Sequence, residues 1–254
     1  MDLHVDPPLT LSRLTARHRW VLPLALLIFL ALGVGAVFNT LPWDEAITNW
    51  IVNDLRSPTL DSIVKRVSFL GSTPVVLSVA AVAAALAWRR CPRLALAIVV
   101  IALCRPLAEF ALKELVARDR PAGNRMVNGT GYSFPSGHPL ATAASWGLLP
   151  LVLSLYTRRR ALWWALTISV WTLAVLVAAS RVWLGVHWAS DVVAALALAV
   201  LGVAASERLI RATHGTRRPK GKRCCEGTDA ASPAVEGQHV DADVVDRPVL
   251  ETAS

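Results

Sequence analysis

The sequence predicts an all-α, polytopic membrane protein built as a bundle of six transmembrane helices. Two features of its composition support this prediction. Of the 254 residues, 54% are hydrophobic and only 17% are charged, whereas soluble domains average about 25% charged residues. Lys and Arg outnumber Asp and Glu by 26 to 18, and a basic excess interleaved with apolar runs is a signal of membrane topology. The composition therefore argues against a soluble α/β enzyme, a disulfide scaffold or a nucleic-acid-binding protein.

Six apolar runs are each long enough to cross the membrane, since about 30 Å of hydrocarbon requires roughly 20 helical residues. The predicted spans cover residues 20–38, 67–88, 94–116, 139–157, 161–180 and 188–209. Between the first two spans, Trp43, Ile47 and Trp50 recur at helical spacing. This pattern predicts a helix over 43–55 that lies on the outer membrane surface or packs as a lid on the bundle, with Asp44 on its polar side.

The distribution of Lys and Arg predicts the orientation. With both termini in the cytoplasm, the cytoplasmic connections contain 16 of these residues and the opposite connections contain seven, in agreement with the positive-inside rule. We expect a multi-pass protein of the cell membrane, with a cytoplasmic segment over 1–19 and a membrane domain over 20–210. Residues 211–254 contain Gly, Pro, basic residues and scattered acids, which predicts a disordered cytoplasmic tail. The excess of Arg over Lys, 22 to four, is typical of a bacterial genome rich in GC.

The third span carries charged side chains that require a reason, because a charge near the membrane centre costs about 2.5–3.5 kcal/mol. Arg105, Glu109 and Lys113 are spaced by four and share one helix face. We interpret Arg105 and Glu109 as a self-neutralising ladder inside the bundle, and Lys113 as a functional group near the outer surface. A transporter or ion pathway that uses this ladder, with a kink at Pro106, is an alternative. That alternative leaves the polar residues of three outer segments without a role.

These three segments are far apart in the sequence but fall at the outer ends of the predicted spans. They contain Lys113 with Arg120-Pro121, then Pro135-Ser136-Gly137-His138, and finally Ser180-Arg181 with His187 and Asp191. Lys113, Arg120 and Arg181 offer positive charge for a tetrahedral anion. Ser136 and the Gly137 amide lie at a predicted helix N-terminus, where the helix dipole favours an anion. These residue types predict a phosphate-binding site on the extracytoplasmic side.

The two histidines of these segments can supply the chemistry. His187 and Asp191 are four residues apart at the start of the last span, so they share one helix face. The carboxylate can accept the Nδ1 proton and leave Nε2 free as a nucleophile. His138 can protonate a leaving oxygen, because an imidazole pKa of about 6.5 suits acid–base work near neutral pH. No carboxylate cluster is present for Mg²⁺, so we expect the guanidinium groups to balance the phosphate charge without a metal or other cofactor.

These residues resemble the signature of the type 2 phosphatidic acid phosphatase superfamily, which includes membrane lipid phosphatases and the vanadium haloperoxidases. The signature has three parts, K-x6-RP, PSGH and SR-x5-H-x3-D, and all eleven fixed positions are present at the right spacing. The resemblance implies a six-helix bundle, a covalent phosphohistidine on His187 that Asp191 orients, and His138 as the general acid. It also implies a metal-independent reaction, with the phosphate bound by Lys113, Arg120, Ser136, Gly137 and Arg181.

The resemblance further implies an integral membrane phosphatase whose partners are a lipid phosphate or pyrophosphate and the surrounding membrane lipids. An undecaprenyl-type pyrophosphate is the first choice, and phosphatidic acid, phosphatidylglycerol phosphate and diacylglycerol pyrophosphate stay open. A lipid phosphotransferase with the same phosphoenzyme is the alternative enzyme. Two local details remain. We expect Pro139 at the first position of its helix, which places His138 just outside that helix, and we expect Arg118 to be a solvated surface residue rather than a ligand of a second phosphate.

Overall fold

The computed structural model describes residues 19–123, 125–157 and 159–214, and every regular element among them is a helix. The all-α prediction is therefore confirmed for the described part of the chain. In chain order the helices are α2 (Val21–Val37), α3 (Pro42–Trp50), the π-helical turn η1 (Ile51–Leu55), α4 (Pro58–Phe69), α5 (Thr73–Arg90), α6 (Pro92–Val116), α7 (Gly137–Trp146), α8 (Leu149–Ser154), α9 (Arg160–Trp183) and α10 (Ala189–His214).

Proline and serine set several of the helix starts. Pro42, Pro58 and Pro92 each occupy a first-turn position, where the missing N–H costs nothing and the fixed φ favours the helix. Ser57 adds a side-chain cap, because its hydroxyl accepts the backbone N–H of Leu60 at 3.5 Å. In the connection between the first two predicted spans, where the sequence predicts one helix over 43–55, Pro42 starts α3 and Ser57 with Pro58 starts the separate helix α4.

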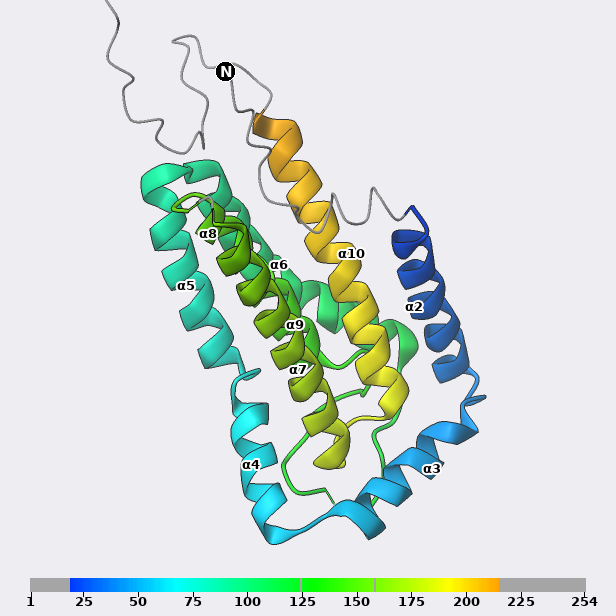
Figure 1. The fold of residues 1–254 in the computed structure, drawn as a ribbon. Coiled ribbons are helices and arrows are strands. Elements are labelled where there is room, and N and C mark those ends of the chain that lie inside the picture. Colours follow the sequence, from blue (N-terminus) through cyan, green and yellow to red (C-terminus); the bar gives the residue numbers. More distant parts are fainter. Residues whose placement is uncertain (1–18, 124, 158, 215–254) are drawn as a thin grey trace, which may run out of the picture.

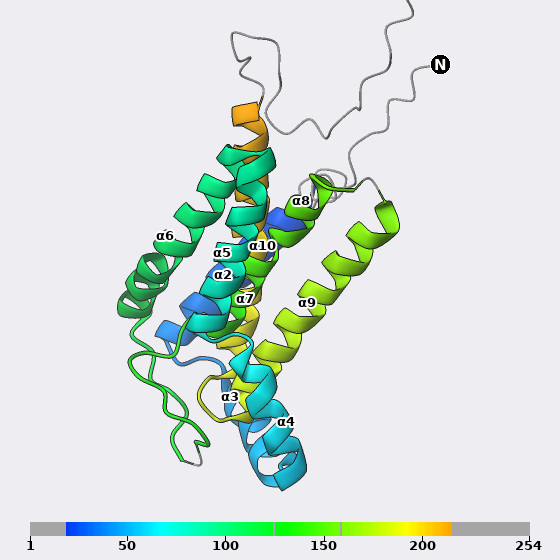
Figure 2. The ribbon, with the colours of Figure 1, turned by 90° about the vertical axis from the view of Figure 1, so that its left-hand side faces the viewer.

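The helices form a bundle in which α5, α6, α9 and α10 run alongside α2 and the α7–α8 pair (Figures 1 and 2). Four described helices, α5, α6, α9 and α10, are long and apolar enough to cross a membrane. A fifth crossing is obtained if α2 is counted with α3–η1, which turns away from it by 91°. A multi-pass membrane protein is thus supported, while the count of six spans stays a prediction.

Two predicted spans differ from the observed helices for identifiable reasons. The span over 139–157 is divided between α7 and α8, because Pro150 lacks the N–H needed to continue one helix and lies in the first turn of a new one. The span over 67–88 loses its beginning to α4, which ends at Phe69, before α5 starts at Thr73. Lys65 and Arg66 therefore lie exposed on a separate helix and not inside a span.

The core is made of small residues that let the helices approach closely. Ala80, Ala83 and Ala87 of α5 are buried against α6 and α8. Ala143 of α7 and Ala174 of α9, both fully buried, meet α10 in a second cluster. Small residues are enriched where helices pack in membranes, since packing rather than exclusion of water holds helices together there. This packing fixes α7, α9 and α10, the three helices that carry the second and third motif segments.

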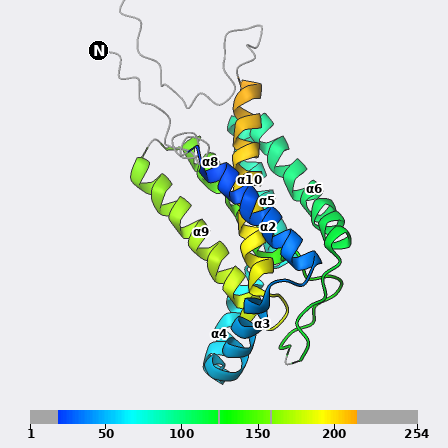
Figure 3. The same ribbon diagram turned by 90° about the vertical axis from the view of Figure 1, so that its right-hand side faces the viewer.

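The two ends of the bundle differ in content. Residue 19 and the end of α10 lie at one end, whereas α3, α4 and the loops 117–136 and 184–188 gather at the other (Figures 1 and 3). The chain therefore begins and ends its described part on the side opposite the motif segments. The predicted cytoplasmic segment and disordered tail fall mostly on 1–18 and 215–254, outside the described residues; residues 211–214 continue α10.

Candidate active site

The three motif segments meet at one end of the bundle, next to α3 and α4 (Figure 1). In chain order the residues are Lys113 in the last turn of α6, Arg118 and Arg120 in the loop after it, Ser136, Gly137 and His138 at the start of α7, Arg181 in the last turn of α9, His187 in the loop before α10, and Asp191 in the first turn of α10. The ends of four helices and two loops thus contribute to one region.

His187 is 2% exposed, and both of its ring nitrogens have partners. Nδ1 lies 2.8 Å from the backbone carbonyl of Ser133. Because a carbonyl oxygen can only accept, Nδ1 carries the proton and donates it there. Nε2 then holds a lone pair, and Nη1 of Arg120 lies 3.2 Å from it. The ring is thus held in the tautomer whose Nε2 is available as a nucleophile.

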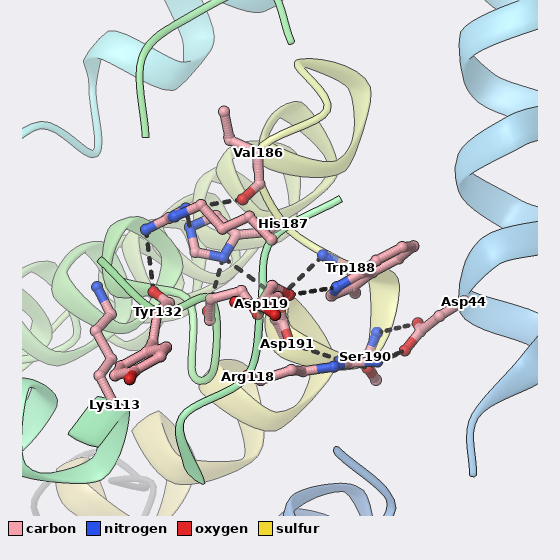
Figure 4. Close-up of polar contacts among 12 residues, drawn as sticks. Asp44, Lys113, Arg118, Asp119, Tyr132, Val186, His187, Trp188, Ser190 and Asp191 are labelled. Carbon is pink, nitrogen blue, oxygen red and sulfur yellow. Dashed lines mark hydrogen bonds and ion pairs between the residues drawn. The ribbon is translucent and has the colours of Figure 1, made fainter. Parts of the chain in front are cut away.

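The partner of Nδ1 differs from the sequence prediction. We expected Asp191 to accept this proton, but its Oδ2 lies 3.5 Å from Nδ1 of His187 and accepts the backbone N–H of Trp188 at 3.0 Å. The nearer acceptor is a main-chain oxygen of the loop before α7, which residue spacing cannot reveal. Asp191 still places a buried negative charge beside the imidazole (Figure 4).

The environment keeps His187 unprotonated. Burial is the main reason that the pKa of His187 is lowered to about 4; Asp191 opposes this effect, and Arg120 and Arg181 add to it. The unprotonated imidazole is the form that can attack phosphorus. His187 is therefore in its reactive form at neutral pH.

Arg118 joins Asp191 to Asp44 of α3 in a buried cluster (Figure 4). Its Nη1 donates to Asp191 Oδ1 at 2.8 Å and to Ser190 Oγ at 2.7 Å, and its Nη2 donates to Asp44 Oδ2 at 2.8 Å. The backbone N–H of Ser190 donates to Asp44 Oδ1 at 2.8 Å, and its hydroxyl donates to Oδ2. The cluster fastens α3 to the first turn of α10, directly beside the imidazole.

Two sequence predictions are wrong at this cluster. Arg118, expected on the solvated surface, is 7% exposed, and Asp44, expected on a polar outer side, is 1% exposed. A charged group is tolerated in such a place only when it is paired and hydrogen-bonded, and each residue supplies that partner for the other. Because 74 positions separate them in the chain, the local pattern around either residue does not predict the pair.

Arg120 is fixed by the surrounding loops. Its guanidinium donates at 2.7–3.1 Å to four backbone carbonyls, those of Thr130, Gly131, Tyr132 and Val186. Burial lowers the pKa of Arg120, while the charge of Asp191 opposes this effect; the group nonetheless stays a cation. These bonds hold a positive charge beside Nε2 of His187, where a phosphoryl group would have to arrive.

The charge ladder predicted on the third span is present on α6. Nζ of Lys113 lies 2.7 Å from Oε1 of Glu109, and Nη1 of Arg105 lies 2.7 Å from Oε2. The Glu109 carboxylate also lies against Gly137, because a Cβ added to that glycine would be only 2.1 Å from Oε1. Lys113 thus belongs both to the ladder and to the motif. The Glu109 carboxylate therefore lies at the N-terminus of α7, where the helix dipole favours negative charge.

Ser136 and Arg181 each have a buried polar atom with no hydrogen-bond partner among the described residues. These atoms are the hydroxyl of Ser136 and Nε of Arg181. Other groups of the two residues are hydrogen-bonded: Nη1 of Arg181 donates to Ser68 Oγ at 2.7 Å, and the Ser136 N–H donates to the Asp191 carbonyl at 3.2 Å. Buried donors normally have partners, and an anion with several acceptor oxygens is the type of ligand that would supply them.

His138 lies inside α7 and not before it, which corrects the prediction made from Pro139. The helix begins at Gly137 after the extended Ser136, and a proline is accepted in a first turn because the N–H groups there have no helical partner. The pKa of His138 is lowered to about 3, chiefly by burial and then by the charges of Arg181, His187, Lys113 and Arg105. Those groups are near enough to act on His138, which places it in the same region.

The candidate site is rich in cations and poor in metal ligands. Within residues 19–208, no three His, Cys, Asp or Glu side chains of the described structure are grouped so that they could hold a metal ion. The nearby carboxylates of Asp44 and Asp191 are bound to Arg118, and that of Glu109 to Lys113 and Arg105. The positive charge for a phosphate can come from the protein itself.

Comparison with known proteins shows which protein family has this combination of motifs. The model of the PAP2 superfamily matches residues 93–213, which include all three motif segments. The chain belongs to the PAP2 superfamily. Phosphatidylglycerophosphatase B of Bacillus subtilis (strain 168) is 27% identical over 187 residues, which cover 70% of this chain and 90% of that protein. Phosphatidylglycerophosphatase B of Escherichia coli (strain K12) is 41% identical over 90 residues, about a third of each chain.

A solved structure supports the same family relationship. The transmembrane PAP2-type phosphatidylglycerolphosphate phosphatase from Bacillus subtilis superposes with a TM-score of 0.68 at 27% identity, covering 78% of this chain and all of that one. The family match, the phosphatidylglycerophosphatase relative and this solved structure together support a lipid phosphatase, which is a hydrolase. The lipid that it hydrolyses, and the part that each residue takes in the reaction, are inferred below.

Proposed function

We propose that the protein removes a phosphate group from a membrane lipid through a phosphohistidine formed on His187. Nε2 attacks phosphorus, and the bond from phosphorus to the lipid oxygen breaks as His138 gives that oxygen a proton. Water then attacks the phosphohistidine, with His138 taking back a proton, and inorganic phosphate leaves. The geometry of His187 is the observation that carries this proposal: Nδ1 donates to the Ser133 carbonyl, and the unprotonated Nε2 lies 3.2 Å from Nη1 of Arg120.

The role of His138 requires that it gain a proton when substrate binds. Its pKa near 3 reflects burial and the surrounding cations, so the free enzyme holds it neutral. A phosphate dianion brings the opposite charge into this cluster and raises the pKa of a neighbouring imidazole. Substrate binding would therefore charge the acid at the moment it is needed, while the more deeply buried His187, hydrogen-bonded through Nδ1, keeps Nε2 unprotonated.

The phosphate oxygens would be bound by the donors that the chain supplies. Arg120 is fixed in place, and Ser136 Oγ and Arg181 Nε lack other partners. Lys113 would transfer from Glu109 to the phosphate. The N-terminus of α7 at Gly137 adds backbone N–H groups and the positive end of the helix dipole. These donors stabilise the charge that develops on the transferring phosphoryl group without a metal ion.

The relatives support a glycerolipid as substrate. The relatives in Bacillus and Escherichia are phosphatidylglycerophosphatases by name, and we extend that substrate, phosphatidylglycerol phosphate, to this chain. An undecaprenyl-type pyrophosphate, favoured by the resemblance alone, has no such support and stays a prediction. The lipid would be taken from the extracytoplasmic leaflet, since the motif segments lie opposite the described chain ends (Figure 1) and the basic residues predict those ends to be cytoplasmic.

A substrate panel tests the proposal. Phosphatidylglycerol phosphate, phosphatidic acid and undecaprenyl pyrophosphate are supplied in mixed micelles with excess EDTA, and inorganic phosphate is measured for the wild type and for His187→Ala. Asp119→Asn, an exposed position in the loop between α6 and α7, is the control. We expect phosphate release by the wild type and the control, fastest from phosphatidylglycerol phosphate, and none by His187→Ala. Activity of His187→Ala would contradict the proposal, and transfer of phosphate to a second lipid would indicate a phosphotransferase.

A further inference from the structure

The end of α4 and the turn that leads into α5, residues 68–71, lie beside the candidate site. Here α4 packs against α9, and α5 packs against α7 (Figures 1 and 2). The N–H groups of Leu70, Gly71 and Ser72 donate to the carbonyls three residues earlier at 2.9–3.1 Å. The backbone of this segment, the 68–71 turn, is therefore compact and hydrogen-bonded to itself, so it can serve as a fixed support for side chains of neighbouring helices.

The side chain of Ser68 supplies a buried acceptor for Arg181. Ser68 is 4% exposed and Arg181 is 7% exposed, and Nη1 of Arg181 donates to Ser68 Oγ at 2.7 Å. Nε of the same guanidinium is buried and has no hydrogen-bond partner among the described residues. Because a guanidinium is planar and its donors form a rigid fork, fixing Nη1 restricts the direction of the other nitrogens. The bond to Ser68 thus orients the group whose Nε is left for a phosphate oxygen.

Two further bonds hold α4 on this end of α9. Nε1 of Trp183 donates to Asp61 Oδ1 at 2.7 Å, and Nε of Arg56 donates to the Trp183 carbonyl at 2.9 Å. Asp61 and Ser68 are seven residues apart, or about two helical turns, so they share one face of α4. That face lies along the last turn of α9, and Ser68 is held in place beside Arg181.

Gly71 brings the turn into contact with the helix that carries His138. A Cβ added to Gly71 would lie 2.6 Å from Val177 Cγ1, 3.0 Å from Thr142 Oγ1 and 3.2 Å from His138 Cβ. Val177 and Thr142 are fully buried, and close-packed side chains have little room to move aside. The Thr142 hydroxyl also donates to the His138 carbonyl at 2.9 Å. The first turns of α7 therefore rest directly on the backbone of Gly71.

We propose that the 68–71 turn positions two groups of the reaction that have different tasks: Ser68 holds Arg181 for phosphate binding, and Gly71 holds His138 for protonation of the leaving oxygen. The proposal rests on the function proposed above. Ser68 and Gly71 act through their neighbours and are positioning residues. Donors that are fixed in advance need no rearrangement in the transition state, and a general acid must stay within hydrogen-bond reach of the oxygen that it protonates.

Inorganic phosphate, the product of the reaction, tests the role of Ser68. Its Ki as a competitive inhibitor of p-nitrophenyl phosphate hydrolysis reports how tightly the site binds phosphate. We expect Ser68→Ala to raise this Ki about tenfold, because Arg181 loses its buried acceptor. Ser68→Thr keeps the hydroxyl and should keep the Ki near the wild-type value. Ser62→Ala is the matched control, since Ser62 is exposed on the same helix and its hydroxyl donates to the Pro58 carbonyl at 3.1 Å.

A different readout tests the role of Gly71. The methyl group added in Gly71→Ala should displace His138, which slows departure of a lipid oxygen more than departure of p-nitrophenolate, a group that leaves without a proton. We expect the ratio of kcat/KM for phosphatidylglycerol phosphate to that for p-nitrophenyl phosphate to fall about tenfold or more, while the Ki for phosphate changes less. Gly202→Ala is the control, because a Cβ there meets no atom within 4 Å. If Gly71→Ala is unstable, adding Val177→Ala removes the closest contact, and the ratio should still fall.

The outcomes separate this proposal from the proposed function. With an active wild type, an unchanged Ki in Ser68→Ala overturns the role of Ser68, and so do equal losses in Ser68→Ala and Ser68→Thr, because packing would then explain the effect. A wild-type ratio in Gly71→Ala, or in the variant that also carries Val177→Ala, overturns the role of Gly71. Each of these results leaves the lipid phosphatase intact. A wild type that releases no phosphate from any lipid overturns the proposed function and this proposal together.

Discussion

Replacing Arg118 with lysine should slow the reaction while substrate binding is kept. The guanidinium bonds Asp191, Ser190 and Asp44 at 2.7–2.8 Å through two nitrogens. A lysine keeps the charge, but its single ammonium cannot reproduce this rigid fork. At least one charge-assisted hydrogen bond should be lost, and such bonds contribute about 1.5–3 kcal/mol each. The hydrogen bond to Asp191 matters most, because this carboxylate lies beside His187, which gains positive charge in the transition state. If that bond is the one lost, kcat decreases about 10- to 150-fold.

The assay is steady-state hydrolysis of phosphatidylglycerol phosphate in mixed micelles, with kcat and KM determined separately. Arg125→Lys is the control, because Arg125 is exposed in the same loop and bonds the Pro121 carbonyl at 2.7 Å. We expect Arg118→Lys to lower kcat with KM within about threefold of the wild type, and the control to be unaffected. An unchanged kcat refutes the reasoning. A rise in KM alone shows instead that Arg118 binds substrate. If the Arg118→Lys protein is unfolded at the assay temperature, the role of Arg118 is purely structural.

Three further predictions follow from the site. Because the pKa of the free His187 is lowered to about 4, the loss of kcat/KM that comes from protonating His187 should appear only below about pH 4; an acidic limb near 6.5 would indicate an ordinary imidazole. His138→Asn should slow lipid hydrolysis by about 10²–10⁴ but affect p-nitrophenyl phosphate less, since its leaving group needs no proton; equal losses would remove the acid role. Gly137→Ala should raise KM, because the added methyl displaces the Glu109 carboxylate from 2.1 Å and disturbs Lys113, so an unaltered KM would contradict the assigned phosphate contacts.

The sequence predicts the helical elements and the site well where the signal is local. The apolar runs identify the four helices that are long and apolar enough to cross a membrane, and His187 and Asp191 at a spacing of four indicate a shared region. Two features with local signals differ from the prediction: the break between α7 and α8, and the position of His138. Pro150 and the preceding Gly147 could have indicated that α7 and α8 are separate helices. The position of His138 was misjudged because proline is tolerated anywhere in a first turn.

The parts that depend on distant contacts could not be predicted in this way. The acceptor for Nδ1 of His187 is the main-chain oxygen of Ser133, and every residue has such an oxygen. Asp44 resembles an ordinary charge on an amphipathic helix, and Arg118 resembles a loop cation; only the fold brings them together beneath α10. A charge that the local pattern assigns to the surface is buried when a partner from another element neutralises it.

Trapping the phosphoenzyme tests the central claim most directly. Enzyme mixed with lipid phosphate labelled in the phosphoryl group is quenched in denaturant at alkaline pH, where phosphohistidine survives, and the labelled peptide is identified by mass spectrometry. We predict a single phosphorylated residue, His187, with no label in His187→Ala and with label that forms and disappears more slowly in His138→Asn. Label on another residue, or full turnover by an enzyme that never carries label, would contradict the account.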